Sequence, residues 1–218
     1  MVIHKSTMNS SSTALFSSFP ARLLAYLQMM RPANIVTAWA DILAGAAATG
    51  LFAVVMPSDQ IWQIQAWSLD GLTHVPSLLW LILATSGLYG GGVVFNDVFD
   101  AELDAIERPE RPIPSGRSSK IEAIALGLLL LVIGAIAAAQ VSWLSCGLAI
   151  ATALSALLYD SVSKHSVIFG PLNMGTCRGL NLLLGISILP AMVLPLSFLA
   201  IIPILYIGAI TAISQGEL

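Results

Sequence analysis

The sequence is poor in charged residues, aromatic residues and cysteine. Only 10% of its 218 residues are charged and 7% are aromatic, whereas 57% are hydrophobic. This composition excludes an ordinary soluble globular protein, because such proteins carry about 25% charged residues. The two cysteines, Cys146 and Cys177, have no partner at metal-ligand spacing, so neither a disulfide nor a zinc site is predicted.

Long apolar runs fill most of the chain. A bilayer core needs roughly 20 consecutive apolar residues, and we expect six spans, at Ala33–Val55, Pro76–Val94, Ile121–Gln140, Ser142–Tyr159, Leu172–Leu194 and Leu196–Ile213. The predicted fold class is therefore all-α, a polytopic transmembrane helical bundle in a lipid bilayer. Residues 1–19 are expected to be a disordered tail rich in Ser and Thr, and residues 20–218 the membrane domain. Pro20–Arg31 is expected to be an amphipathic helix along the interface.

Lysine and arginine are absent from the links Met56–Val75, Val141–Ser142 and Ala191–Pro195. They occur instead in the N-terminal segment and the other links, at Lys5, Arg22, Arg31, Arg108, Arg111, Arg117, Lys120 and Lys164. Because cytoplasmic loops are enriched in Lys and Arg, both termini are predicted to be cytoplasmic.

A polar segment follows the second predicted span and contains Asn96, Asp97, Asp100 and Asp104. On a helix, residues three and four apart are neighbours, so these side chains would present converging oxygens on one face. Hard divalent cations such as Mg²⁺ take carboxylate oxygens and commonly bridge to substrate phosphates. The segment therefore predicts a Mg²⁺–diphosphate site. The alternative is a solvated loop, but random loop acids rarely share one helical face.

Further polar residues concentrate on the same side of the predicted bundle, where ionisable groups usually face a cavity. They are Asn34, Asp41, Tyr159, Asp160, Lys164, His165, Asn173, Arg178 and Asn181. An isoprenyl diphosphate fits this layout, because its apolar tail can lie between helices while its charged head meets Mg²⁺ and basic groups.

Three of these residues have alternative interpretations. Lys164 could contact a phosphate or be an ordinary positive-inside charge, and the sequence does not decide between them. Arg178 favours a functional role, because an arginine inside a span needs a partner or a wet cavity and its guanidinium matches a phosphate. Asp41 could as easily be a packing acid paired with a neighbouring hydroxyl, so we do not assign it to the site.

Two adjacent motifs resemble the first signature of the UbiA superfamily of intramembrane prenyltransferases: Asn96-Asp97-x-x-Asp100-x-x-x-Asp104 and Arg111-Pro112-Ile113-Pro114-Ser115-Gly116. That family has similar residues at the places of Arg31-Pro32-Ala33-Asn34 and of Tyr159 with Lys164. The resemblance covers about residues 20–218. Residues 170–181 are similar to a UbiA-like branch encoded in ebo-type biosynthetic clusters.

The resemblance implies a fold, a function and a site. Members of the family are helical, usually with nine spans, and bind an isoprenyl diphosphate through Mg²⁺ held by two acidic motifs. The implied reaction moves an isoprenyl group from an allylic diphosphate to an aromatic or similar small acceptor. Carried over, the Mg²⁺ ligands would be Asn96, Asp97, Asp100 and Asp104. The three aspartates and Lys164 would be catalytic, and substrate would be bound by Asn34, Asn96, Arg111, Tyr159, Asn173 and Arg178.

The sequence departs from the family pattern at its C-terminal end. A second acidic motif is expected after the sixth span, where Ser214-Gln215-Gly216-Glu217-Leu218 stands and only Glu217 could ligate a metal. Three expected spans are also missing. We therefore expect either a fragment, which we favour, or a short form whose bundle is completed by a second copy in a homo-oligomer.

Two other functions remain open. A non-catalytic UbiA-like membrane protein would bind or hand over an isoprenoid or a biosynthetic precursor without Mg²⁺-dependent diphosphate release. An ion-coupled transporter explains the acids less well, because they cluster at one end of the spans and not at the midplane. We expect a multi-pass protein of a bacterial inner (plasma) membrane, with the site facing the cytoplasm and with no nucleic-acid partner.

Overall fold

The computed structural model describes residues 22–51, 53–54, 65–66 and 69–216. Residues 22–30 are helical, and the longer helices that follow are α2 (Pro32–Ala48), α4 (Val75–Phe99), α6 (Lys120–Ala139), α7 (Trp143–Ser161), α8 (Phe169–Ile186) and α9 (Ile201–Gly216). Shorter elements are α3 (Leu69–Thr73), α5 (Ala101–Glu107), the 3-10 turns η1 (Ser163–His165), η2 (Pro190–Met192) and η3 (Ser197–Ala200), and the antiparallel pair β1 (Ala53–Val54) and β2 (Gln65–Ala66).

Four of the described helical segments are long and apolar enough to cross a membrane, namely 75–99, 120–139, 143–161 and 197–214. They coincide with the second, third, fourth and sixth predicted spans. α2 and α8 lie at the first and fifth predicted spans but do not meet the same criterion of length and hydropathy. The predicted polytopic helical bundle is confirmed, and the small β1–β2 pair is the one departure from it among the described residues.

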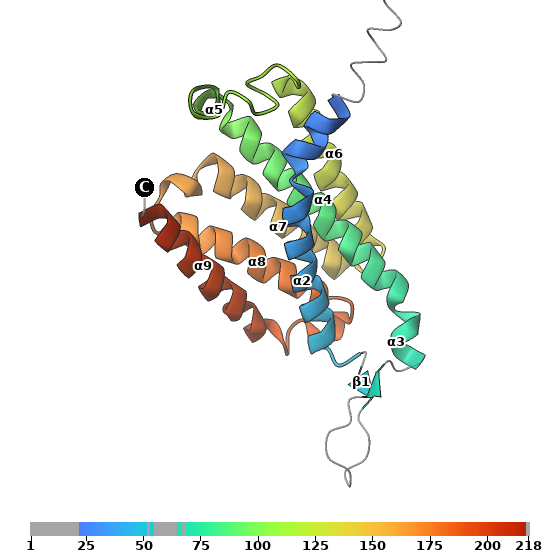
Figure 1. Ribbon diagram of the computed structural model, residues 1–218. Helices are drawn as coiled ribbons and strands as arrows, with labels where there is room; N and C mark the ends of the chain where they lie inside the picture. The colour runs from blue at the N-terminus through green and yellow to red at the C-terminus, as the bar shows by residue number, and fades with distance from the viewer. Residues whose placement is uncertain (1–21, 52, 55–64, 67–68, 217–218) are drawn as a thin grey trace, which may run out of the picture.

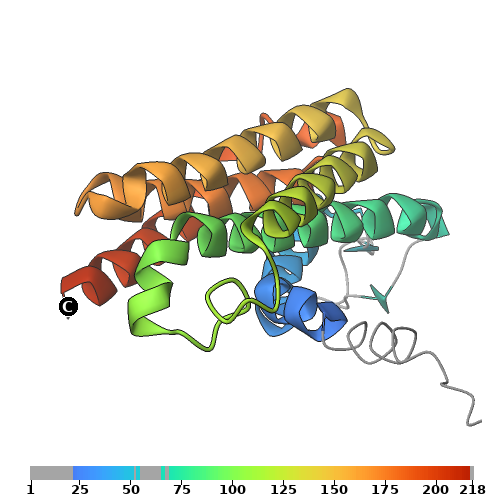
Figure 2. The ribbon, with the colours of Figure 1, turned by 90° about the horizontal axis from the view of Figure 1, so that it is seen from above.

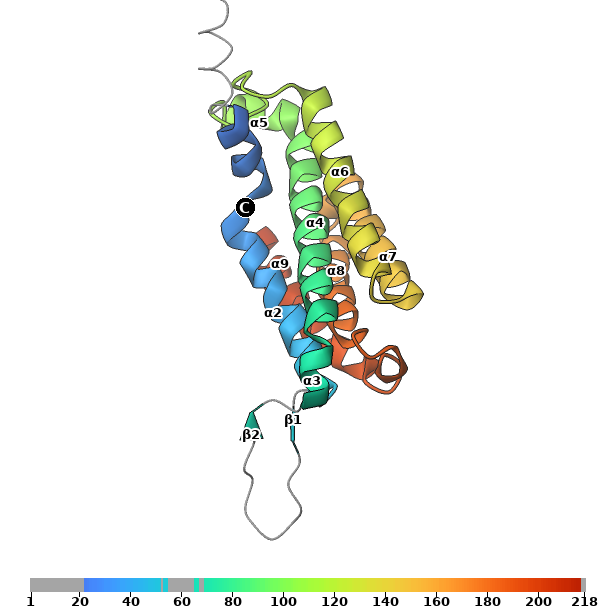
Figure 3. The same ribbon diagram turned by 90° about the vertical axis from the view of Figure 1, so that its right-hand side faces the viewer.

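The helices pack around α4 and α8. α4 contacts α6, α2 and α7, and α8 contacts α9, α2 and α7. Figures 1 and 2 show α4 crossing the bundle, with α5 and the loop that follows it at one end beside residues 22–30. The β1–β2 pair lies at the opposite end (Figure 3). The acidic segment is therefore held at one end of the bundle.

The predicted ends of two spans are wrong. The first was expected to reach Val55, but α2 ends at Ala48 because Gly50 adopts a left-handed conformation with φ 72°, which is typical of a helix C-terminus. The fifth was expected to reach Leu194, but α8 ends at Ile186. Pro190 opens the 3-10 turn that follows, and proline disfavours the helical conformation in the residue before it.

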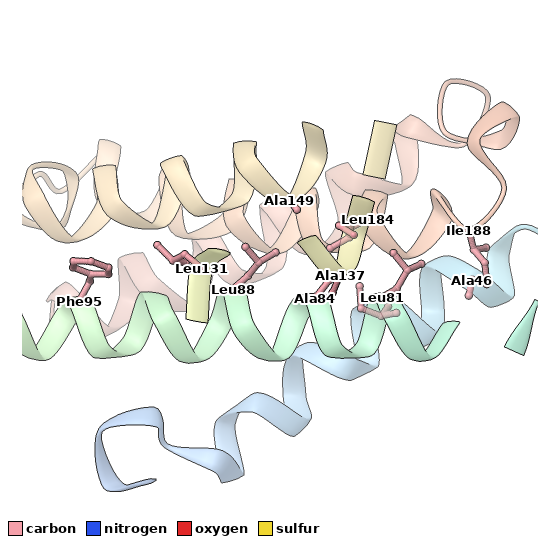
Figure 4. Packing of buried hydrophobic residues seen from close by; sticks show 12 residues of the cluster. Ala46, Leu81, Ala84, Leu88, Phe95, Leu131, Ala137, Ala149, Leu184 and Ile188 are labelled. Atoms are coloured by element: carbon pink, nitrogen blue, oxygen red, sulfur yellow. The ribbon is translucent and has the colours of Figure 1, made fainter. Parts of the chain in front are cut away.

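Apolar side chains from most of the long helices form the main core (Figure 4), which includes Ile42, Leu81, Leu88, Leu131 and Leu184. Glycines let two of the helices approach closely. A Cβ atom at Gly45 would lie 2.4 Å from the Leu182 carbonyl oxygen, and one at Gly185 would lie 2.5 Å from the Ile42 carbonyl oxygen. Small residues of this kind allow close helix packing in membranes, and here they place the middle of α2 against α8.

The helix of residues 22–30 has an apolar side that faces outward. Leu23, Leu24 and Leu27 are exposed, whereas Ala25 and Met29 are buried. Met29 belongs to a second small core with Val94, Val98 and Ala123. The expected amphipathic helix is thus docked on the ends of α4 and α6. The expected tail at residues 1–19 lies outside the described residues.

Candidate functional site

The acidic segment spans the junction between α4 and α5, where the chain turns at Asp100. Asp97 and Asp104 are 5% and 3% exposed, which is rare for carboxylates unless they are paired. Both bind the same nitrogen, Nη1 of Arg111, at 3.3 and 2.6 Å. One guanidinium from the α5–α6 loop therefore holds together two aspartates that are seven residues apart.

Arg31 supplies the second cation for Asp97, with Nη2 2.7 Å from Oδ1. Its backbone has φ 47° and ψ 66°, and a non-glycine residue in this left-handed region carries strain that the surrounding structure must offset. Pro32 follows it as the first residue of α2. The strained turn directs the Arg31 side chain to α4.

The other two members of the acidic segment contact the end of α7 and the 3-10 turn η1 that follows it. Asp100 is paired with Lys164 of η1, and Asn96 Nδ2 donates to Oδ1 of the buried Asp160 at 3.0 Å. Of the four residues expected to converge, Asp97 and Asp104 thus share Arg111, whereas Asn96 and Asp100 have separate partners, Asp160 and Lys164. We call Arg31, Asn96, Asp97, Asp100, Asp104, Arg111, Asp160 and Lys164 the mouth cluster.

A cavity of about 290 Å³ extends from the mouth cluster between α2, α4, α7 and α8. Much of its wall is apolar or weakly polar. Its lining residues are Arg31, Asn34, Thr85, Leu88, Tyr89, Gly92, Val93, Asn96, Thr152, Ala156, Tyr159, Asp160, Met174, Cys177, Arg178 and Asn181. An elongated ligand could therefore place its apolar part in the cavity between the helices and its charged head at the mouth cluster.

A second polar group lies deeper, where α2, α4 and α8 meet; we call Asp41, Thr85, Arg178 and Asn181 the inner cluster. Arg178 Nε and Nη2 lie 3.1 and 3.2 Å from the two carboxylate oxygens of Asp41. Asn181 Nδ2 donates to Asp41 and to the Ala38 carbonyl, and Asn181 Oδ1 accepts from Thr85. Asp41 pairs with an arginine, not with the hydroxyl considered from the sequence.

The structure brings together most of the residues that we predicted for the site. Asn34, Asn96, Tyr159 and Arg178 line the cavity, and the remaining acids, Arg111 and Lys164 belong to the mouth cluster. Asn173 is apart from both, because its side chain contacts Ser155 and Ser163 and it does not line the cavity. Its predicted role in binding substrate has no geometric support.

Besides Asp41, four residues of the site were left out of the prediction from the sequence. Arg31 and Asp160 contact Asp97 and Asn96, and Thr85 and Asn181 line the inner part of the cavity. Three of them carried a usable signal, since polar groups in or beside apolar spans usually face a cavity. Thr85 carried none, because a threonine can satisfy its hydroxyl within its own helix.

Most of the chain matches the model of a known family. The family model described as "UbiA prenyltransferase family" matches residues 61–215. The chain belongs to the UbiA prenyltransferase family. The UbiA signature expected from the sequence at residues 96–116 lies within the matched region, and the resemblance is confirmed.

Named relatives are similar in sequence to this UbiA-family chain, and a solved structure shares its fold. A digeranylgeranylglyceryl phosphate synthase of Methanothrix thermoacetophila is 31% identical over 74% of this chain and 54% of that protein. One from Saccharolobus solfataricus is 30% identical over 75% of this chain and 51% of that protein. A solved structure, titled for the biosynthesis of digeranylgeranylglyceryl phosphate synthase in membranes, has a TM-score of 0.67 at 24% identity and covers 86% of this chain and 60% of its own.

The UbiA-family chain spans about half the length of the curated relatives that it matches. Together with the four apolar helices, family membership makes it an integral membrane protein. UbiA-type prenyltransferases generally use a divalent metal. In the part of the chain that the structure describes, no three carboxylate, thiol or imidazole groups are gathered as metal ligands, and Glu217 lies outside that part.

Proposed function

We propose that the chain carries the donor half of a Mg²⁺-dependent intramembrane prenyltransferase, which transfers an isoprenyl group from an allylic diphosphate to a small acceptor. The observation that carries the proposal is the mouth cluster, which gathers carboxylates and cations at one end of a cavity between apolar helices. An isoprenyl diphosphate has the matching division into a charged head and an apolar tail.

The residues present fit a magnesium ion. In the mouth cluster, the four carboxylates of Asp97, Asp100, Asp104 and Asp160 outnumber the three cations Arg31, Arg111 and Lys164. An excess of buried negative charge favours a further cation, since an uncompensated buried charge is costly. Mg²⁺ usually takes one or two carboxylates together with substrate phosphates, so it does not require a cage of three protein acids. One or two of the carboxylates of Asp97, Asp100 and Asp104, with Asn96, would hold it.

The cations of the mouth cluster suit the diphosphate. Arg111 and Arg31 each present guanidinium N–H groups beside Asp97, and Lys164 lies beside Asp100. Such groups form strong charge-assisted hydrogen bonds to phosphate oxygens. Mg²⁺, when bound, would neutralise charge that develops on the departing diphosphate.

The proposed reaction breaks the bond between the first isoprenyl carbon and the diphosphate oxygen. The diphosphate leaves with the electron pair, and the resulting allylic carbocation stays in a cavity whose apolar wall excludes water. The acceptor then forms a bond to this carbon with its own electron pair and loses a proton. Asp160, a buried carboxylate in the cavity wall, is placed to receive that proton.

The acceptor is proposed from two sources. The sequence resemblance favours an aromatic or similar small acceptor, whereas the relatives' name indicates that they make a glyceryl phosphate lipid carrying two geranylgeranyl groups. We propose a small acceptor with a nucleophilic hydroxyl or activated ring, and both classes belong in the first screen. The positive charges near the mouth cluster favour a cytoplasmic site, in the bacterial inner membrane that the sequence led us to expect.

The test is Mg²⁺-dependent binding of geranylgeranyl diphosphate to the full chain purified in detergent. Asp97→Asn and Asp100→Asn should each weaken binding by about tenfold or more. Glu122→Gln is the matched control: it also removes one carboxylate, but Glu122 caps α6 outside the mouth cluster and glutamine can replace it there. Equal losses in all three variants would refute the ligand assignment.

Release of diphosphate distinguishes a prenyltransferase from a protein that only binds or hands over an isoprenoid. A prenyltransferase should release diphosphate from the bound donor when Mg²⁺ and an acceptor are present, and Asp100→Asn should abolish that release. Tight binding with no release under any acceptor would favour the non-catalytic protein that binds or hands over an isoprenoid.

A further inference from the structure

The positive charge of Arg178 is already balanced within the bundle. Its Nη2 donates to Asp41 Oδ1 at 3.2 Å and to the Thr37 carbonyl at 3.0 Å, and its Nε lies 3.1 Å from Asp41 Oδ2 at ion-pair distance but without a hydrogen bond to any described residue. The two side chains are only 18% and 14% exposed. Arg178 and Asp41 therefore form a neutral unit, and a phosphate bound there would meet no net positive charge unless it displaced Asp41 and left a buried carboxylate unpaired.

The remaining groups of the inner cluster have committed most of their hydrogen bonds. Asn181 uses both of its N–H groups and accepts from Thr85. On Arg178, Nε is buried without a hydrogen bond, and Nη1 has neither a hydrogen bond nor an ion pair with the described residues. Because Arg178 lines the cavity, the inner cluster offers a ligand hydrogen-bond donors without a net charge.

We propose that the inner cluster is the acceptor subsite, where Arg178 donates to a neutral oxygen of the acceptor, a hydroxyl or carbonyl, and does not bind the diphosphate. This inference rests on the proposed prenyl transfer. The distance between the inner cluster and the mouth cluster follows from the rise of α2. The Arg178 guanidinium contacts the Thr37 carbonyl, and Thr37 is six residues beyond Arg31 of the mouth cluster, which is roughly 9 Å at 1.5 Å per residue. One small molecule can span that distance, with its nucleophile near the mouth cluster and its far oxygen on Arg178.

Cys177 offers a reporter for this subsite, since it precedes Arg178 and lines the same cavity. In the full chain carrying Cys146→Ser, alkylation of Cys177 by N-ethylmaleimide is followed by mass spectrometry. Two small aromatic competitors of similar size are compared, neutral benzyl alcohol and anionic benzoate. Benzyl alcohol should halve the alkylation rate at a concentration about tenfold lower than the concentration of benzoate that has the same effect. The benzoate carboxylate must give up its hydration to enter the cavity, and the inner cluster has no unpaired cation to bind it in return.

Two variants test whether the pairing of Arg178 with Asp41 causes the preference for a neutral ligand. Asp41→Asn keeps the shape but leaves Arg178 unpaired, so it should invert the order of the two competitors. Thr85→Val, which removes a neutral hydrogen bond from the same cluster, should keep the order. The proposal is overturned if benzoate protects better in the chain with native Asp41, if Asp41→Asn leaves the order unchanged, or if Cys177 is never alkylated. The first comparison needs neither inner-cluster variant, so a folding failure of Asp41→Asn does not prevent the test.

Donor binding distinguishes this proposal from the proposed function. Arg178→Met should weaken Mg²⁺-dependent binding of geranylgeranyl diphosphate far less than Asp97→Asn does, and it should abolish protection by benzyl alcohol. Equal losses of donor binding would place Arg178 at the diphosphate and overturn the inference. If no variant or native chain binds the donor while benzyl alcohol still protects Cys177, the proposed function fails and the neutral-ligand subsite stands.

Discussion

Gly185→Ala should separate α2 from α8 and destabilise the protein. A Cβ atom at this position would lie 2.5 Å from the Ile42 carbonyl oxygen, 2.8 Å from Ile42 Cα and 3.0 Å from the Asp41 carbonyl oxygen. All three are backbone atoms and cannot rotate away. To reach an ordinary contact distance, the two helices must move apart by roughly 1 Å.

The magnitude follows from two opposing effects. Overpacking a close contact costs typically about 1–3 kcal/mol, whereas replacing a helical glycine by alanine gains up to about 1 kcal/mol of helix propensity. We expect a net loss of about 1–2 kcal/mol of unfolding free energy. The same displacement would stretch the pair of Asp41 and Arg178, which is 3.1 Å long, so the preference of the inner cluster for neutral ligands should weaken too.

The assay is thermal unfolding in detergent, with Gly147→Ala as the matched control. Gly147 is also helical, in α7, and an added Cβ would meet no atom within 4 Å. Gly147→Ala should leave Tm unchanged or raise it, and Gly185→Ala should lower it by roughly 2–8 °C. The same Tm for the two variants would show that α2 and α8 do not cross this closely in the membrane protein.

Three further predictions concern the mouth cluster and α6. Lys164→Met should weaken binding of geranylgeranyl diphosphate by roughly tenfold, because it removes a cation beside Asp100; His165→Gln is the neighbouring control, and equal effects would make Lys164 an ordinary surface charge. Asp160→Asn should slow prenyl transfer by roughly 100-fold while slowing diphosphate release much less, as single-turnover product analysis would show; equal slowing of both would argue against a role as base. Ser119→Ala removes the N-cap of α6 and should cost about 1 kcal/mol of stability, which an unchanged Tm would contradict.

Hydropathy predicted where the helices are, because each bilayer-spanning segment must be apolar along its own length. It did not predict where α2 and α8 end. Those ends depend on single residues, the left-handed Gly50 and the helix-ending Pro190, whose effect does not appear in an average over apolar residues. The sequence therefore predicted the number and order of the long helices better than their boundaries.

Some contacts of the site could likewise be predicted from the sequence, and others could not. The acids from Asp97 to Asp104 are local in sequence, so their spacing could be interpreted directly. The pairing of Asp41 with Arg178 joins residues 137 positions apart and depends on the close approach at Gly45 and Gly185. Arg31 reaches Asp97 from a strained backbone conformation that no local pattern indicated. Contacts set by tertiary packing were the ones that the sequence could not supply.

The loop between α5 and α6 is tied to the helix of residues 22–30. Arg117 donates to Gln28 Oε1 at 2.6 Å and to the Glu110 carbonyl at 2.5 Å. The loop carries Arg111 and the helix leads into Arg31, so the two arginines that bind Asp97 stand on mechanically coupled segments. A displacement of the loop would therefore act on the helix as well, so the exposure of the Asp97 carboxylate depends on both segments at this end of the bundle.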